Sequence, residues 1–137
     1  MLDPGELQKK TARILEDLGC KPDSIISITV VDAVRMAELN LKYRGKEGPT
    51  NVLSFSQLEG NSPPQKNLLG DVVICADRAV DDAAELGYTV DEMVLYLLIH
   101  GILHLLGHTH DLSEDEQDMS ARVEEIFRGL HPEVEST

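Results

Sequence analysis

The sequence predicts a single α+β domain over residues 1–137, in which a small mixed β-sheet packs with helices. Three observations lead to this fold class. A length of 137 residues fits one domain with a core of its own. Short segments with alternating apolar residues predict strands, and longer segments with apolar residues at helical spacing lie between them. The two kinds of segment intermix without the regular alternation of a doubly wound sheet.

The first third of the chain is predicted to form two helices on either side of a strand. Asp3 is placed to cap the first helix, which Gly19 ends. The β-branched, alternating segment from Ser24 to Val31 predicts a strand. Asp32 then caps a second helix, which runs to about Tyr43.

Two more strands are predicted in the middle of the chain, separated by a loop. After a segment with two glycines and a proline (44–50), residues 51–57 alternate as in a strand. Residues 58–67 contain a glycine and two consecutive prolines, which is typical of a surface loop. Residues 68–76 predict the third strand.

Three helices are predicted in the remainder. The first covers residues 76–86 and ends at Gly87. A capping box, Thr89–Glu92, opens a long apolar helix to about Leu106. A second capping box, Ser113–Glu116, opens the final helix.

The charge balance restricts the possible functions. Acidic residues outnumber lysine and arginine 25 to 12, for a formal net charge of −13. This excludes nucleic-acid binding through a generally basic surface, although not through a local one. Residues 35–46 form such a local exception, because four bases stand there against one acid.

Other features of the composition indicate a cytoplasmic protein without membrane contact. Cys20 and Cys75 lie far apart and form no C-x-x-C motif, so neither a disulfide framework nor a cysteine zinc site is expected. The N-terminus has no signal-peptide pattern. The longest apolar stretch, Met93 to Leu106, is too short to span a bilayer.

Four of the five histidines lie within residues 100–110, and three of them have the spacing of a metal site. His100 and His104 are four residues apart on the predicted apolar helix, so their imidazoles share one face. Gly107 permits the chain to turn after the helix, which can bring His110 back as a third ligand. Three imidazoles and an open fourth position predict a catalytic site with one Zn²⁺ per chain.

The histidine spacing is compatible with two kinds of metal chemistry, peptide hydrolysis and phosphodiester cleavage. The histidine spacing equals that of metzincin peptidases, in which a glutamate directly after the first histidine is the general base. Gly101 stands at that position, so a zinc metallopeptidase remains an alternative that lacks its proton acceptor. Cleavage of a phosphodiester fits better, because the metal can activate water while a nearby cation stabilises phosphoryl charge. The basic segment Lys42–Lys46 can supply such a cation.

Four motifs in this order resemble the YbeY family. They are NLKYRGK (40–46), PTNVLSF (49–55), LGDVVIC (69–75) and HGILHLLG (100–107), the last followed by His110. The resemblance extends from about residue 24 to about residue 128.

This resemblance implies a metal-dependent endoribonuclease of zincin-like fold, whose metal-binding helix carries the HxxxH motif. It implies metal ligands at His100, His104 and His110 and an arginine essential for cleavage at Arg44. The basic side chains of Lys42 and Lys46 are further candidates for contacting the RNA backbone.

The resemblance also implies a biological role. The expected activity is single-strand-specific cleavage of RNA, and not of DNA, in maturation of the 16S rRNA 3′ end and in ribosome quality control. The implied partners are the rRNA precursor, ribosomal proteins of the small subunit and an rRNA-associated GTPase. A non-catalytic, metal-binding ribosome-assembly factor is the remaining alternative, which the open metal position argues against.

The sequence departs from the family at the third expected ligand. Family members typically read Gly-Tyr-Asp-His there, whereas this chain reads Gly-His-Thr-His over residues 107–110. A ligand histidine usually needs a partner that orients its ring. Thr109 is a candidate through a turn hydrogen bond, and Asp71 and Asp111 are candidates through their carboxylates.

Overall fold

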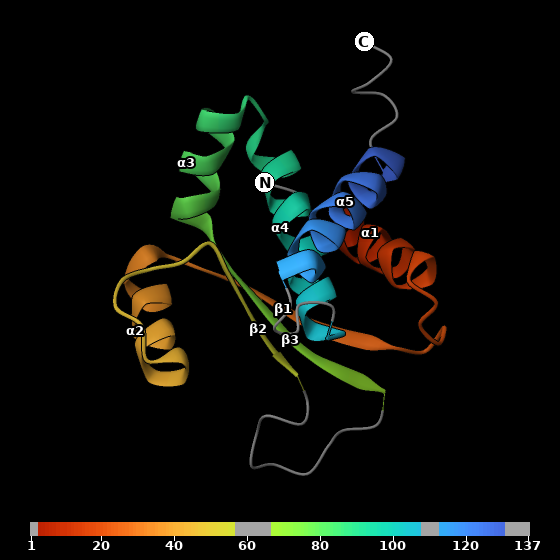
Figure 1. Ribbon diagram of the computed structural model, residues 1–137, viewed down its shortest axis with the longest axis horizontal. Coiled ribbons are helices and arrows are strands. Elements are labelled where there is room, and N and C mark those ends of the chain that lie inside the picture. The colour runs from red at the N-terminus through yellow and green to blue at the C-terminus, as the bar shows by residue number, and fades with distance from the viewer. Residues whose placement is uncertain (1–2, 57–66, 108–112, 131–137) are drawn as a thin grey trace.

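The structure is a computed structural model that describes residues 3–56, 67–107 and 113–130. Its helices and strands are α1 (Pro4–Asp17), β1 (Ile25–Val31), α2 (Ala33–Arg44), β2 (Val52–Ser56), β3 (Leu68–Cys75), α3 (Ala76–Leu86), α4 (Val90–Leu105) and α5 (Ser113–Leu130). The predicted α+β architecture is confirmed, and each bound that the sequence predicted agrees with the structure to within one or two residues (Figure 1). Most of the expected loop at 58–67 lies outside the described residues, as do the side chains of the second capping box.

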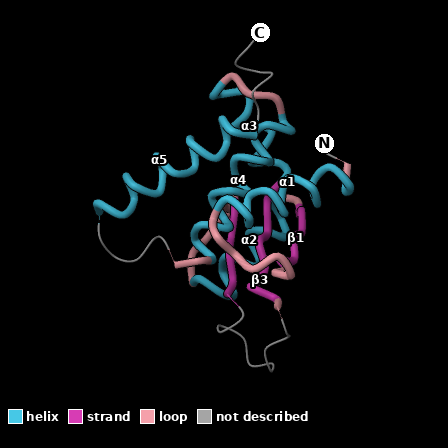
Figure 2. The backbone as a smooth tube through the Cα atoms, turned by 90° about the vertical axis from the view of Figure 1, so that its right-hand side faces the viewer, coloured by secondary structure: helices cyan, strands magenta, loops and turns pink. Residues whose placement is uncertain are grey.

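The three strands form a small mixed sheet in the order β1-β3-β2. β1 and β3 run parallel and side by side (Figure 2), with Ile28 opposite Val72. β2 runs antiparallel to β3, with Ser54 opposite Val72. The parallel pair requires a crossover connection, and the chain between the two strands contains α2 and β2.

Helices cover both faces of the sheet (Figure 1). Alternate residues of β3 point to opposite faces, so Val72 and Ile74 join the larger core with α1, α3, α4 and α5. Val73 and Cys75 join a smaller core with Met36 of α2. The two cores place α2 and α4 on opposite sides of the same strands.

α4 is the central helix, and ten of its sixteen residues are buried. The predicted capping box is confirmed, because the Thr89 Oγ1 accepts from the Glu92 amide at 3.1 Å and Glu92 Oε1 accepts from the Thr89 amide at 2.7 Å. Within the described ranges no single helix is long and apolar enough to cross a membrane, and α3 and α4 meet that test only as a pair bent by 110°.

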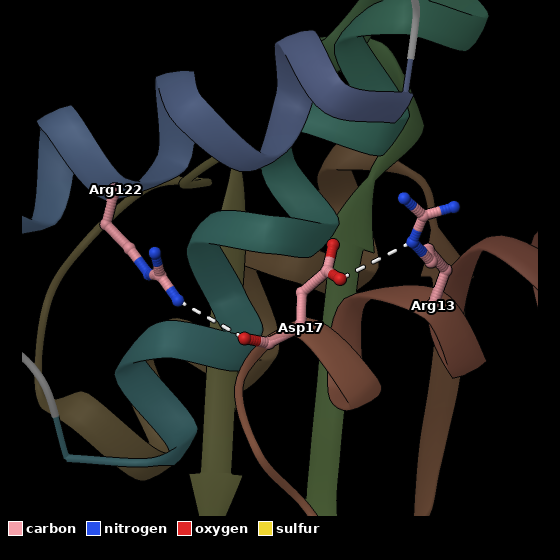
Figure 3. A network of polar contacts seen from close by, with 3 residues as sticks. All are labelled: Arg13, Asp17 and Arg122. Atoms are coloured by element: carbon pink, nitrogen blue, oxygen red, sulfur yellow. Dashed lines mark hydrogen bonds and ion pairs between the residues drawn. The ribbon is translucent and has the colours of Figure 1, made fainter.

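A polar contact joins α5 to the end of α1 (Figure 3). Arg122 donates from Nη2 to the Asp17 carbonyl oxygen at 3.3 Å, and Arg13 donates from Nε to the Asp17 carboxylate at 3.4 Å. These groups are partly exposed, so each contact contributes little to stability. The apolar contacts of Val123, Ile126 and Phe127 with the larger core hold α5 in place.

α2 is fixed at its N-terminus by two carboxylates. Asp32 caps the helix as predicted, by accepting from the Arg35 amide at 2.8 Å. Asp77 of α3 accepts from the Ala33 amide at 2.7 Å, which joins the start of α2 to a helix 44 residues later in the chain. At the other end, Gly45 adopts the left-handed conformation, with φ of 67°, that ends the helix directly after Arg44.

Candidate active site

A cleft of about 600 Å³ lies between the end of α2, the strand β2 and the last turns of α4. The residues that line it are Asn40, Arg44, Lys46, Thr50, Asn51, Val52, Leu53, Ser54, Ser56, His100, His104, Leu105 and Gly107. Four residues that the sequence predicts as site residues therefore come together, namely Arg44, Lys46, His100 and His104. Arg44 and Lys46 come from the end of α2 and the loop after it, whereas the two histidines come from α4, much later in the sequence.

The two histidines of α4 point their ring nitrogens at each other. The Nε2 atoms of His100 and His104 are 2.9 Å apart, and the ring centroids are 4.5 Å apart. Burial, together with the neighbouring His104 ring, lowers the pKa of His100 from 6.5 to about 4. Burial also lowers the pKa of His104. Both imidazoles are therefore neutral at pH 7, and the neutral form is the one that binds metal ions.

This pair fits two ligands of one metal ion. Two nitrogens that bind the same Zn²⁺ at about 2.0–2.1 Å lie no more than about 4 Å apart, a condition that the Nε2 atoms meet. Among the described residues no group of three metal-ligating side chains occurs. The third expected ligand, His110, lies outside the described residues, as do Thr109 and Asp111.

Arg44 lies at the open edge of β2. Its Nη2 donates to the Ser54 carbonyl oxygen at 2.6 Å, and its guanidinium carbon lies 4.7 Å from the centre of the Phe55 ring. The side chain is exposed and lines the same cleft as the histidines. The contacts with β2 orient the guanidinium, whose planar set of donors suits a phosphate group.

Two polar residues that the sequence analysis did not assign help to shape the cleft. Asn40 is buried and donates from Nδ2 to the Gly48 carbonyl oxygen at 2.9 Å, which holds the loop that carries Lys46. Ser54 donates from Oγ to the Gly101 carbonyl oxygen at 2.7 Å, which joins β2 to α4. An amide on the apolar side of a helix, four residues after Met36, is a signal that could have identified Asn40.

Two other predicted residues do not line the cleft. The Lys42 Nζ lies 5.1 Å from the centre of the Tyr43 ring, outside the cleft lining. Asp71 is exposed on β3 and shares the sheet face of Val73 and Cys75, which packs on α2. His100 and His104 lie on the opposite side of the sheet, so the structure does not bring the Asp71 carboxylate to these two histidines. Successive side chains of a strand point to opposite faces of the sheet. Asp71 therefore faces α2, whereas the residue before it and the residue after it face α4.

The described lining of the cleft contains cations but no carboxylate. Arg44 and Lys46 are its two charged residues, in a chain with 25 acidic residues and 12 basic ones. The other polar groups of this lining are amides, hydroxyls and the two neutral imidazoles. The cleft therefore suits an anionic group, despite the net charge of −13.

Gly101 lies where α4 packs most closely on the sheet. A Cβ atom at this position would lie 2.7 Å from a methyl group of Val72, 3.1 Å from one of Val52 and 3.2 Å from the Ser54 hydroxyl. Position 101 thus faces β2 and β3, where a longer side chain has no space. A general base cannot occupy this position as it does in metzincin peptidases, so the geometry argues against that alternative.

Gly101→Ala is expected to lower the free energy of unfolding by about 1–3 kcal/mol, because the added methyl group overpacks the contact between helix and sheet. Urea unfolding measures this change through the transition midpoint. Gly129→Ala is a matched control, since a Cβ at that helical position meets nothing within 4 Å. The control should leave stability unchanged or raise it slightly. Equal midpoints for Gly101→Ala and the parent protein would contradict the close packing.

Comparisons with known proteins show the family of this chain. Residues 2–131 match the family described as "Endoribonuclease YbeY". A protein of that name from Syntrophotalea carbinolica is 40% identical over 130 residues, which cover 93% of this chain and 86% of the relative. Another from Symbiobacterium thermophilum is 44% identical over 121 residues, which cover 85% and 78% of the two chains.

A solved structure supports the same fold. The solution structure of a Thermotoga maritima protein superposes with a TM-score of 0.66 and 24% identity, over 96% of this chain and 83% of that one. At this identity the likeness concerns the fold alone. The match over residues 2–131 and the identity to curated relatives decide the family: the chain belongs to the YbeY family of endoribonucleases.

Proposed function

We propose that this chain is a zinc-dependent endoribonuclease that cleaves single-stranded RNA. Its site consists of His100, His104 and His110 as metal ligands and Arg44 as the residue that holds the scissile phosphate. The biological role that we propose is maturation of the 16S rRNA 3′ end and ribosome quality control in the cytoplasm. The proposed partners are ribosomal proteins of the small subunit and an rRNA-associated GTPase.

The observation that carries the enzymatic proposal is the composition of the described cleft lining. Two cations and two neutral imidazoles face a space without carboxylates, in a protein that is otherwise strongly acidic. A peptidase needs a proton acceptor near its metal, whereas a phosphodiester needs positive charge at its non-bridging oxygens. The cleft lining offers the positive charge that phosphodiester cleavage needs.

Each side chain has a distinct part in the proposed reaction. Arg44 binds the phosphate, and its bond to the Ser54 carbonyl fixes the direction of the guanidinium. Lys46 adds positive charge from the start of the loop that Asn40 holds. His100 and His104 stay neutral and keep their nitrogens directed at one point on the cleft wall. The Arg44 side chain is held by its backbone contact before any substrate arrives, which limits reorganisation during the reaction.

The zincin-like metal site is part of the same proposal. When bound, Zn²⁺ supplies Lewis acidity toward a phosphoryl oxygen and toward water. The arginine then stabilises the charge that develops on the phosphoryl oxygens during bond cleavage.

The proposal predicts a clear selectivity between polymers. Purified protein with zinc should cut a circular single-stranded RNA into a linear product, because an endonuclease needs no free end. Circular DNA of the same sequence, fully paired RNA and casein should stay intact. Gel electrophoresis of all four substrates measures the result. Casein cleavage without RNA cleavage would instead support the peptidase alternative, and equal cutting of paired RNA would exclude single-strand specificity.

A further inference from the structure

Four side chains next to the cleft form a row in which two aromatic rings lie between two cations. The row consists of Lys42, Tyr43, Phe55 and Arg44. The Lys42 Nζ lies 5.1 Å from the centre of the Tyr43 ring, and the Tyr43 and Phe55 ring centres are 5.2 Å apart in an edge-to-face arrangement. The Arg44 guanidinium carbon lies 4.7 Å from the Phe55 ring centre. We call these four residues the aromatic row.

Tyr43 is exposed to an unusual degree for an aromatic residue in this chain. The sequence has three tyrosines, two phenylalanines and no tryptophan. Tyr88, Tyr96 and Phe127 pack against one another beside the larger core. Tyr43, in contrast, is 51% exposed at the end of α2. Its apolar ring surface therefore lies in solvent beside the cleft.

The aromatic row begins where the cleft ends. Arg44 belongs to both, because it lines the cleft with the histidines and also stacks over the Phe55 ring. The side chains of Arg44 and Tyr43 contact the same ring, because the guanidinium carbon lies 4.7 Å and the Tyr43 ring centre 5.2 Å from the centre of the Phe55 ring. A polynucleotide whose phosphate lies at Arg44 thus reaches Tyr43 with the next nucleotide. The Lys42 ammonium group beyond the ring can attract a further phosphate.

We propose that Tyr43 is a stacking platform for the base of the nucleotide next to the phosphate that Arg44 holds. The proposal rests on the proposed function, and it names the feature of the RNA that the same site recognises. Aromatic rings flanked by cations are the usual way in which proteins hold single strands without reading their sequence. A paired base is already stacked within its helix, so it cannot lie on the ring. Tyr43 therefore contributes to the preference for single strands and is a specificity residue.

The structure allows a simpler role, in which Tyr43 only packs on Phe55 and stabilises the end of α2. The two roles differ in one measurable property. A packing residue changes the affinity for RNA equally at every nucleotide, whereas a platform loses its effect at the single position whose base it contacts. Removing bases one at a time from the ligand therefore distinguishes them.

The experiment measures binding of the zinc-loaded protein to a labelled single-stranded 2′-O-methyl RNA of about 12 nucleotides, a length within known single-strand site sizes. Fluorescence anisotropy gives the dissociation constant, and a gel after each titration checks that the RNA is intact. A set of ligands carries one abasic nucleotide at each position in turn. The protein variants are Tyr43→Leu, Tyr43→Phe and Tyr43→Trp, and Leu41→Ala is the matched control, since Leu41 is 58% exposed on the same helix.

For the parent protein, one abasic position should weaken binding about tenfold, as expected for a stacked base that contributes between about 1 and 3 kcal/mol. Tyr43→Leu should weaken binding of the intact RNA to a similar extent and abolish the penalty at that position. Tyr43→Phe and Tyr43→Trp should keep the penalty, as should Leu41→Ala. A retained penalty in the Tyr43→Phe and Tyr43→Trp proteins also shows that the protein tolerates substitution at position 43.

Two results would overturn the inference in different ways. If Tyr43→Leu shows the same penalty at the same abasic position as the parent protein, the platform role is wrong while the proposed function stands. If the parent protein does not bind single-stranded RNA at all, the proposed substrate is wrong, and the platform falls with it.

Discussion

His104→Ala is expected to remove the bound metal and to reduce RNA cleavage to the background rate. His104 supplies one of two nitrogens that lie 2.9 Å apart, and its ring is near the surface of the cleft. Loss of a group that merely orients a ligand typically costs 10- to 100-fold in metal affinity, so loss of a ligand should cost more than about 100-fold. Metal analysis of protein purified without a chelator or an affinity tag should find about one ion per parent chain and almost none per variant chain.

The same preparations show whether the effect is local. His104 lies outside both hydrophobic cores, so its truncation removes no core contact, and the metal-free variant and metal-free parent should unfold at the same temperature. His131→Ala is the control for a histidine outside the spaced set and should keep both metal and activity. A full metal content in His104→Ala would refute the assignment of this ligand.

Arg44→Lys should reduce the rate of RNA cleavage by about 10²–10³-fold, the usual loss when one well-placed donor to a developing anion is removed. Lysine keeps the positive charge but lacks the planar fork that holds two phosphate oxygens. Lysine also cannot form the contact of a guanidinium plane with the Phe55 ring while it donates to the Ser54 carbonyl. The loss should therefore appear although the net charge is unchanged.

Cleavage, zinc content and thermal unfolding should be measured on one Arg44→Lys preparation. Zinc content should stay at the parent level, since Arg44 is not a ligand, and the melting temperature should change little, since the side chain is exposed. Lys46→Arg keeps the charge of the neighbouring loop and serves as the control. Full activity with a lowered melting temperature would mean that Arg44 only stabilises the end of α2 and the edge of β2.

Local signals in the sequence were sufficient to predict the helices. Asp3, Asp32 and Thr89 cap the helices that follow them, and each bond is formed with an amide two or three residues away. Gly45 and Gly87 end helices in the left-handed conformation. Such contacts depend on neighbouring residues only, so the sequence contains all the information needed.

Contacts between distant segments could not be predicted in this way. Asp77 caps α2 from a helix 44 residues further along the chain, and nothing in the sequence around Asp77 indicates that partner. The parallel pairing of β1 with β3 likewise depends on how the intervening chain folds. The face of β3 on which Asp71 lies follows from the same pairing, and it places the carboxylate on the side of the sheet away from His100 and His104.

The same difference between local contacts and contacts of distant segments applies to the candidate site. The spacing of His100 and His104 is a property of one helix, and the structure brings their nitrogens together as that spacing predicts. The place of Arg44 beside them had to come from a family resemblance, because it depends on α2 ending at the edge of β2. The hydroxyl of Ser54 and the amide of Asn40 entered the site only with the tertiary structure.

The molecule is acidic as a whole but its cleft is cationic, and this difference affects the rate at which RNA and the protein meet. A net charge of −13 repels a polyanion at long range, and this repulsion decays over a Debye length of about 10 Å at 0.1 M salt. In the proposed site, Arg44 and Lys46 would attract a phosphate only within that distance. Electrostatic steering accelerates the approach of nucleic acids to many proteins, but the net negative charge of this protein gives no such acceleration. Moderate salt should therefore speed its first contact with RNA rather than slow it. We therefore expect this field to keep random RNA in solution away and to favour an unpaired strand that another molecule holds at the cleft.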